Sequence, residues 1–298
     1  MKKLLITILA VMMVLSFAAC AAPANEVDVD IEETQTAEAP AEEPTEPAAE
    51  ESNAAEDLSW KSIEEKGSFI LGFDQAFPPM GFKDDNGEYV GFDIDMAKEV
   101  ASRLGLELKL QPVDWEAKVM EMDNGNVDLI WNGLTINEKN KKGMLFSEPY
   151  MNNRQIIVVA ADSDITSIAD LAGKSVAAQI DSSGLAAIEA QPEVMDTFGE
   201  LIQSPDYVSA FMELKQGTVD AVVVDEIFGK YYITQENATN VYKVLDDSFG
   251  DEQYGIGFRM NDIAFRDKIQ ETINAMIADG TAAEISNKWF SDNIVIGG

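Results

Sequence analysis

Histidine is absent from this 298-residue chain, cysteine occurs once, and basic residues are scarce, with 21 Lys and Arg against 54 Asp and Glu. The lack of histidine excludes a His-based catalytic triad and every His-containing metal site. The single cysteine allows neither an intramolecular disulfide nor a thiolate zinc cage. We therefore expect no metal and no cofactor, whereas carboxylate acid/base chemistry remains open. The net charge of −33 argues against nucleic acid and against an anionic membrane surface as direct partners.

The N-terminus has the pattern of an export signal. A basic pair, Lys2 and Lys3, precedes an apolar run over 4–17 that is too short for a comfortable membrane span of roughly 20 residues. Small residues lead directly to Cys20, and the stretch 17–20 resembles a lipobox. We predict a signal peptide over 1–19 and a lipid on Cys20. The alternative is that Cys20 is an ordinary residue of a discarded signal.

The segment 20–57 has the composition of a tether. Between residues 21 and 57 it is rich in Ala, Glu, Pro and Thr and contains no Lys, Arg, Gly or aromatic residue. Such a composition cannot bury enough apolar surface to offset the entropy lost on ordering. We therefore predict a disordered, acidic lipoprotein tether, extended by its own charge repulsion.

From Leu58 onward, short apolar strands alternate with amphipathic helices in two successive units. In the first unit we expect strands at 68–72, 106–110 and 127–131, with helices at 96–104 and 115–122. In the second we expect strands at 156–160, 175–180 and 221–224, with helices at 168–171 and 207–215. This alternation is typical of mainly parallel sheets covered by helices.

The C-terminal part has one expected strand, 254–258, and two helices, about 262–279 and 281–290. Because it lacks a complete sheet of its own, we expect it to return to the first unit. The chain would then cross between lobes twice, near 151–155 and 246–254, as a hinge beside a cleft. The predicted organisation is one lobe over 58–153 and 251–298 and a second lobe over 154–250.

Several motifs, in order along the chain, resemble the polar amino-acid family of extracytoplasmic solute-binding proteins, family 3. The stretch Gly91-Phe92-Asp93-Ile94-Asp95-Met96 before a helix is similar to the family signature, although taken alone Asp93 or Asp95 could simply cap that helix. The other matching stretches are Asp74-Gln75-Ala76-Phe77-Pro78-Pro79-Met80, Asn132-Gly133-Leu134-Thr135-Ile136, Phe146-Ser147-Glu148-Pro149-Tyr150, 217–225 and Asn287-Lys288-Trp289-Phe290.

The resemblance implies a type II periplasmic-binding-protein fold, α/β, with two mainly parallel sheets joined by a double-crossover hinge. It implies a lipid-anchored, extracytoplasmic protein that closes on a small polar amino acid and delivers it to an ABC permease. We expect a monomer and no enzymatic activity. Two other classes stay open: a receptor that presents ligand to a sensor, and a dehydratase-like enzyme on the same fold.

The family implies two acidic positions in the cleft. Asp225, after the buried strand, matches the acceptor of the ligand's ammonium, and its alternative role is the N-cap of the following helix. Asp74 matches the other acidic position, and its alternative role is to satisfy the backbone of the turn around Pro78.

The remaining implied ligand contacts come from both lobes: Phe77, Trp115, Asn132, Gly133, Thr135, Asn140, Gln179, Ser182 and Ser183. Phe77 and Trp115 would form aromatic walls, or else pack in the core. Gly133 would offer its N–H and Thr135 its hydroxyl. Gln179 would contact the ligand's side chain. Ser182 and Ser183 begin a helix and would either face a carboxylate or serve as ordinary caps.

One position departs from the family pattern. Asn140 stands where the family carries an Arg that grips the ligand carboxylate, and an amide supplies neither the charge nor the fork of a guanidinium. Three explanations are open. The neighbouring Lys139 or Lys141 takes over, Arg154 reaches the cleft from the hinge, or the ligand lacks an ordinary α-carboxylate.

Overall fold

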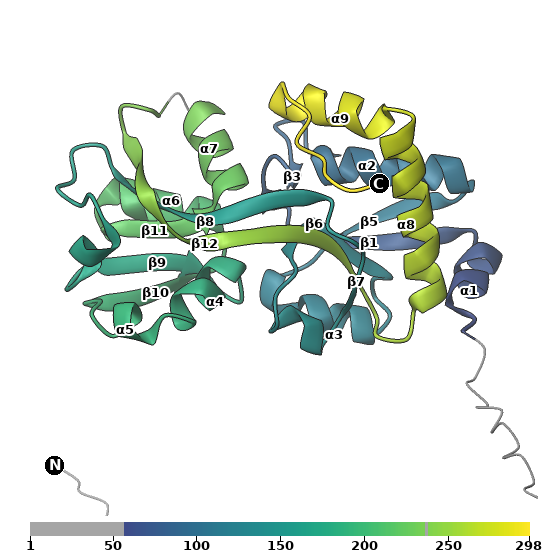
Figure 1. Ribbon diagram of the computed structural model, residues 1–298, viewed down its shortest axis with the longest axis horizontal. Coiled ribbons are helices and arrows are strands. Elements are labelled where there is room, and N and C mark those ends of the chain that lie inside the picture. The colour runs from purple at the N-terminus through teal and green to yellow at the C-terminus, as the bar shows by residue number, and fades with distance from the viewer. Residues whose placement is uncertain (1–56, 236–237) are drawn as a thin grey trace, which may run out of the picture. The chain divides into compact units, whose positions relative to one another are not determined.

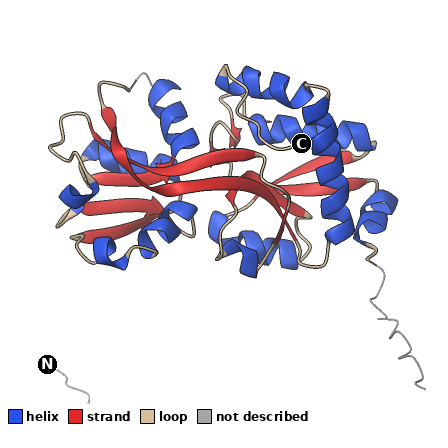
Figure 2. Cartoon of the chain, in the orientation of Figure 1, coloured by secondary structure: helices blue, strands red, loops and turns tan. Residues whose placement is uncertain are grey.

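A nine-stranded mixed sheet runs through the computed structural model, which describes residues 57–235 and 238–298 (Figures 1 and 2). The strand order is β10-β9-β11-β8-β12-β6-β1-β5, with β7 paired to β12. The described residues belong to one compact unit, Ala54–Gly298. The predicted signal, Cys20 and all of the predicted tether except Asp57 lie outside the described residues. In the part of the chain that the structure describes, no helix is long and apolar enough to cross a membrane.

The first lobe, as we use the term, contains the parallel strands β5, β1 and β6 and the helices packed on them. Its strands are β1 (Ser68–Phe73), β2 (Ala76–Phe77), β3 (Gly81–Lys83), β4 (Tyr89–Val90), β5 (Glu107–Pro112), β6 (Leu129–Thr135) and β7 (Leu145–Phe146). Its helices are α1 (Ser59–Lys66), α2 (Phe92–Leu104), η1 (Trp115–Ala117), α3 (Lys118–Asp123), η2 (Asn140–Lys142), α8 (Ile263–Ala278) and α9 (Thr281–Phe290). All seven residues of β6 are buried, because helices cover both faces of the sheet.

The second lobe contains the parallel strands β10, β9 and β11. Its elements are η3 (Ile168–Leu171), β9 (Ser175–Gln179), α4 (Ser183–Glu189), α5 (Pro192–Met195), β10 (Glu200–Ser204), α6 (Tyr207–Gln216), β11 (Ala221–Asp225) and α7 (Glu226–Gln235). Helices α4 and α5 lie on one side of these strands and α6 and α7 on the other (Figure 1). The wholly apolar run 221–224 makes β11 a buried central strand.

Two long antiparallel strands, β8 (Met151–Ala160) and β12 (Tyr242–Phe258), belong to both lobes. Where the chain passes between the lobes, Met151 pairs with Tyr254 and Arg154 with Asp251. The two predicted sheets are therefore hydrogen-bonded into one continuous sheet. The boundaries predicted for the lobes, 58–153 with 251–298 and 154–250, stay a prediction.

The C-terminal helices pack on the first lobe. The ring of Phe265 in α8 lies 6.0 Å from Phe69 of β1 and 5.5 Å from Phe258 of β12, between ring centroids. This packing brings residues after the second crossing back to the strands that begin the fold.

The alternative role considered for Asp93 and Asp95, capping of α2, is not present in the structure. Gly91 is the N-cap residue and no side chain caps the helix. Only glycine fits there, because its φ is 144° and an added Cβ would lie 2.2 Å from the Met80 carbonyl oxygen. The buried Asp93 side chain turns inward, and Asp95 instead accepts a hydrogen bond from the indole N–H of Trp289 (2.9 Å).

Candidate ligand-binding cleft

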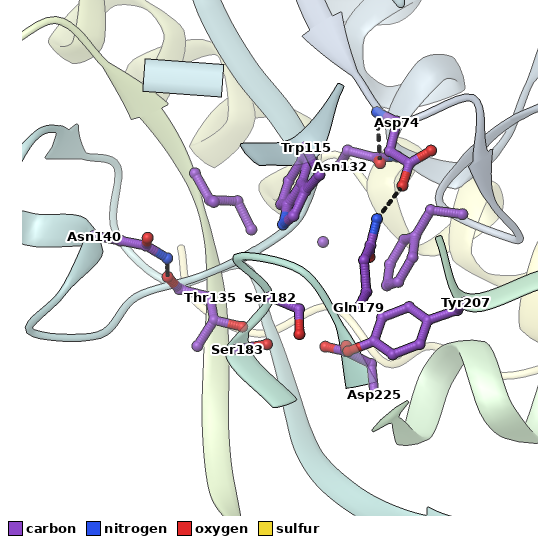
Figure 3. A pocket seen from close by; sticks show the side chains of 13 residues that line it. Asp74, Trp115, Asn132, Thr135, Asn140, Gln179, Ser182, Ser183, Tyr207 and Asp225 are labelled. Carbon is purple, nitrogen blue, oxygen red and sulfur yellow. Dashed lines mark hydrogen bonds between the residues drawn. The ribbon is translucent and has the colours of Figure 1, made fainter. Parts of the chain in front are cut away.

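A narrow cavity lies between the two lobes (Figure 3). Thirteen residues line it: Asp74, Phe77, Trp115, Asn132, Gly133, Leu134, Thr135, Asn140, Gln179, Ser182, Ser183, Tyr207 and Asp225. The structure therefore brings together all eleven side chains or glycines that the sequence analysis selected, from both lobes. That they contact a ligand remains a prediction.

The first-lobe wall follows from where strands β1 and β6 end. Asp74 comes directly after β1, and its N–H donates to Oδ1 of Asn132 in β6 (3.1 Å). Asp74 also accepts from the N–H of Ala76 (2.8 Å), so its predicted role in the turn is present in the structure. Its side chain is buried, and burial raises its pKa. The carboxylate is thus held by its own turn and still faces the cavity.

Gly133 and Thr135 are less free than the sequence analysis expected. The Gly133 N–H donates to Oδ2 of the buried Asp93 (2.8 Å), which also accepts from the Tyr150 hydroxyl (2.9 Å). Burial raises the pKa of Asp93 to about 7. The Thr135 hydroxyl donates to Glu252 (2.9 Å). Both groups that were expected to serve the ligand are therefore already bonded within the protein.

Aromatic rings join the lobes across the cavity. Phe77 from the first lobe lies 5.3 Å from the ring of Phe228 and 6.0 Å from that of Tyr207, both in the second lobe. Phe77 is thus both a cavity wall and a packing residue, so its two proposed roles coexist. Trp115 has its ring beside Lys118, whose amine lies 4.9 Å from the ring centroid.

The second-lobe wall includes the start of helix α4. Ser182 is the N-cap of α4 and accepts from the N–H of Leu185 (3.1 Å), so the ordinary capping role is present. The Ser183 hydroxyl accepts from the amide of Gln155 (2.9 Å). Gln179 donates to Oδ2 of Asp74 across the cleft (2.8 Å), which links the two lobes directly.

Asp225 ends β11 at the base of the cavity and is only 3% exposed. Its Oδ1 accepts hydrogen bonds from the Tyr254 hydroxyl (2.7 Å) and from the Asn153 amide (2.8 Å), both of which are neutral groups. Burial, and then the nearby charge of Glu252, raises the pKa of Asp225 to about 8. The N–H of Ile227 in the first turn of α7 donates to the side-chain Oδ1 of Asn153 (3.4 Å) instead of to Asp225. This carboxyl group therefore lacks a cationic partner, which a ligand could supply.

Two functional candidates escaped the sequence analysis, Tyr207 and Glu252. Tyr207 lines the cavity next to Asp225 (Figure 3), and its pKa is raised by burial and then by the charge of Asp225. It opens helix α6, where an aromatic residue is ordinarily read as core. Glu252 lies in the acidic stretch 246–252 of β12, and nothing in that stretch distinguishes it from its neighbours.

The cations named as replacements for an Arg at Asn140 are paired elsewhere. The ion pairs are Lys139 with Asp181 (2.7 Å), Lys141 with Glu138 (2.9 Å) and Arg154 with Glu226 (2.8 Å). Asn140 itself donates to the Thr135 carbonyl oxygen (2.9 Å). None of the thirteen lining residues, all from the described part of the chain, is Lys or Arg.

A different ion cluster closes the rim of the cleft. Asp181 of the second lobe, in a left-handed conformation with φ 55°, bonds to Lys118 and Lys139 of the first lobe. The Lys118 amine is buried and also donates to the carbonyl oxygens of Trp115 (3.0 Å) and Asp181 (3.2 Å). Burial acts to raise the pKa of Asp181, but the two lysines lower it overall. Within residues 57–235 and 238–298, no group of three or more acidic or cysteine side chains is placed to hold a metal ion.

Two lobes joined by a pair of strands, with a polar cavity between them, define a solute-binding clamp. The chain belongs to the bacterial extracellular solute-binding proteins, family 3, whose model matches residues 69–292. The relatives that the chain matches are named as amino-acid-binding proteins, several of them of ABC transporters.

Three relatives illustrate the likeness. The ABC transporter glutamine-binding protein GlnH of Bacillus subtilis is 30% identical over 78% of this chain and 84% of its own. A substrate-binding protein of an ABC uptake transporter from Streptococcus pneumoniae, solved with bound histidine, has a TM-score of 0.78 and 35% identity, covering 81% of this chain and 99% of that one. An ancestral arginine-binding protein bound to arginine has a TM-score of 0.71 and 37% identity, covering 75% and 98%.

Proposed function

We propose that this protein encloses a small solute with a cationic amino group, an amino acid or an amine of similar size, and delivers it to an ABC permease. The observation that carries the proposal is Asp225, a buried carboxyl group on the cavity wall whose Oδ1 is bonded only to neutral donors. Ionising a buried carboxyl group without a counter-charge is costly, so a ligand cation at this point stabilises the ionised form and gains a strong interaction. The named ligands of the relatives, among them glutamine, histidine and arginine, support the same class.

Capture would work by closure of the lobes around β8 and β12. The contacts between lobes support this: Gln179 with Asp74, the ring of Phe77 with Phe228, and the Asp181 ion cluster all join one lobe to the other. A ligand that touches both walls binds the closed form more tightly than the open form and so shifts the population toward closure.

Attachment to the membrane is part of the proposal. We propose that Cys20 carries a lipid and that 20–57 spaces a monomeric, extracytoplasmic clamp from the membrane. The basic pair, apolar run and small residues before Cys20 support this, because they match an export signal that ends at a cysteine. A single acyl chain binds a membrane only reversibly, and the segment 21–57 has no Lys or Arg to act as a second signal, so stable attachment requires more than one acyl chain on Cys20.

A thermal-shift screen of amino acids and simple amines tests the function. A ligand present at about 100 times its dissociation constant adds about 2.7 kcal/mol of stability, which a melting curve resolves. A screen in which none of these compounds shifts the melting temperature would contradict the proposal. Turnover of a bound compound would contradict the assignment as a binding protein.

Replacement of the central acid tests the assigned contact. Asp225→Asn keeps the shape and the neutral donors but removes the charge, so affinity for the ligand found in the screen should fall at least about tenfold in calorimetry. Asp196→Ala removes an exposed acid remote from the cavity and is the matched control, expected to leave affinity unchanged. Unchanged affinity in Asp225→Asn would contradict the role given to Asp225.

A further inference from the structure

Four hydrogen-bond donors from both lobes converge on one oxygen of Glu252. Oε1 accepts from the amide of Asn153 (2.6 Å), the amide of Gln155 (2.8 Å) and the hydroxyls of Thr135 (2.9 Å) and Ser183 (3.4 Å). Two of these donors, Thr135 and Ser183, belong to the cavity wall. The protein's own carboxylate therefore takes up polar groups that face the ligand space.

The ionisable residues that line the cavity are all acidic. Asp74 and Asp225 line it and Glu252 lies directly behind the wall formed by Thr135 and Ser183, whereas the thirteen lining residues include no Lys or Arg. Cations at the rim and hinge are paired with other acids, Lys118 and Lys139 with Asp181 and Arg154 with Glu226. The wall of the cleft thus holds carboxyl groups in excess over cations.

A carboxylate on the ligand would be poorly received in such a cleft. It would come close to Glu252, which already holds the hydroxyl of Thr135 and the amides of Asn153 and Gln155. The buried donors left on the wall, the Asn132 amide and the Tyr207 hydroxyl, are both neutral. A charged group that is buried beside a like charge and without a counter-charge costs several kcal/mol in proteins generally. A cation meets the opposite situation, since each acid in the wall favours it.

The shape of the wall also suits an aliphatic cation. The aromatic side chains of Phe77, Trp115 and Tyr207 offer apolar faces for a methylene chain and can attract a cation. Asp74 and Asp225 lie at separate places on the wall, with Gln179 drawn between them and Tyr207 beside Asp225 (Figure 3). Two acids set apart in this way match a molecule that carries a cationic group at each end.

We propose that Glu252 takes the place of a ligand carboxylate and that the cleft therefore selects an aliphatic diamine or amino-guanidine over the amino acid with the same chain. This inference rests on the proposed function and narrows the ligand of the same site. Glu252 is then a specificity-determining residue that acts through the donors it occupies and through its charge.

Matched pairs of compounds test the inference on the unaltered protein. Agmatine and arginine, cadaverine and lysine, and putrescine and ornithine differ within each pair only by a carboxylate. Calorimetric titration should show that at least one amine binds at least about tenfold more tightly than its amino acid, because one lost ion pair or one added repulsion is worth that factor or more. The measurement does not depend on any variant being folded.

Glu252→Gln tests the mechanism of selection. The variant keeps the length of the side chain and one acceptor oxygen but removes the charge, so the preference for the amine should fall at least about tenfold relative to the unaltered protein. The matched control is Asp251→Asn. Asp251 is the residue before Glu252 and its side chain is exposed, so this change removes the same charge without touching the cavity wall. Its preference should stay within twofold of the unaltered protein, and melting curves check that both variants are folded.

The outcomes separate this inference from the proposed function. If every amino acid binds more tightly than its amine, the inference is wrong while the binding function stands. Lys139→Ala then shows whether that lysine leaves Asp181 to bind the carboxylate, since amino-acid affinity would fall in that variant. An unchanged preference in Glu252→Gln contradicts the role of Glu252, and an absence of binding by every amine and amino acid contradicts both proposals.

Discussion

Asp225 at the base of the cleft and Asp181 at its rim are aspartates of the same lobe in opposite electrical surroundings. Asp225 has neutral hydrogen-bond partners and a nearby acid, and burial raises its pKa. Asp181 is bonded to Lys118 and Lys139 of the other lobe, and its pKa is lowered despite partial burial. The protein thus provides its own cations at the rim, where lobes must meet, and leaves the inner acid for a cation from outside.

Among the variants that test this difference, Asp181→Asn is expected to change lobe closure and ligand affinity the most. The change leaves the buried Lys118 amine without its carboxylate partner in the closed form, and an unpaired buried charge costs several kcal/mol. The lobes should open to let Lys118 reach water. Small-angle X-ray scattering should show a larger radius of gyration without ligand, and ligand affinity should fall about tenfold or more because less of the protein is closed.

Lys141→Ala is the control for the rim. Lys141 pairs with Glu138, whose side chain is almost fully exposed, so the change should leave both the radius of gyration and the affinity as they are. An Asp181→Asn protein with the same scattering profile and affinity as the unaltered one would show that the rim cluster does not hold the lobes together.

An intermediate loss of ligand affinity is expected from Gly133→Ala, inside the cleft. The residue has φ 59°, and an added Cβ would lie 2.8 Å from the Phe77 ring and 3.2 Å from that of Tyr254. The methyl group must displace the aromatic wall, so affinity should fall several-fold and stability by about 1–2 kcal/mol in denaturant titration. Gly173→Ala separates strain from contact, because Gly173 has φ 73° with nothing near its added Cβ. It should lose stability without losing affinity, and an equal loss of affinity in both variants would contradict the role of the wall.

The smallest effect is expected from Arg154→Ala. Arg154 is bonded to Glu226 and is not among the residues that line the cavity, so ligand affinity should change by less than about twofold. Calorimetry with the ligand found in the screen measures it. A loss of tenfold would mean that Arg154 turns into the cleft when ligand is present, and the division between a cation-free base and a cation-rich rim would be wrong.

The sequence predicted the parts of the cleft that follow from local pattern. Asp225 ends an apolar strand, Asp74 directly follows β1, and Asn132 comes directly after the apolar run that predicted a strand at 127–131. In the structure this strand, β6, continues to Thr135. The α/β two-lobed fold and the family were predicted correctly from the same signals together with the motifs.

Other features depend on contacts that no local pattern carries. Only the end of β12 was predicted, because acidic residues through 246–252 hide the strand that pairs with β8. Glu252 therefore looked like an ordinary surface residue. The bonds that hold it and Lys118 in place come from distant segments. The available N–H of Gly133 was expected from the motif, but Asp93 takes it in the folded chain.

The release of protons on ligand binding tests the central claim most directly. Near pH 7 the carboxyl group of Asp225, with its pKa raised to about 8, is mostly protonated in the empty cleft. A cationic ligand favours the ionised form, so binding should release about one proton per ligand and affinity should increase as the pH rises toward 8. Calorimetry in buffers of different ionisation enthalpy measures this number, which Asp225→Asn should lower to near zero. Binding with no proton release in the unaltered protein, or release that persists in Asp225→Asn, would contradict the assignment of Asp225 as the acceptor of the ligand's cation.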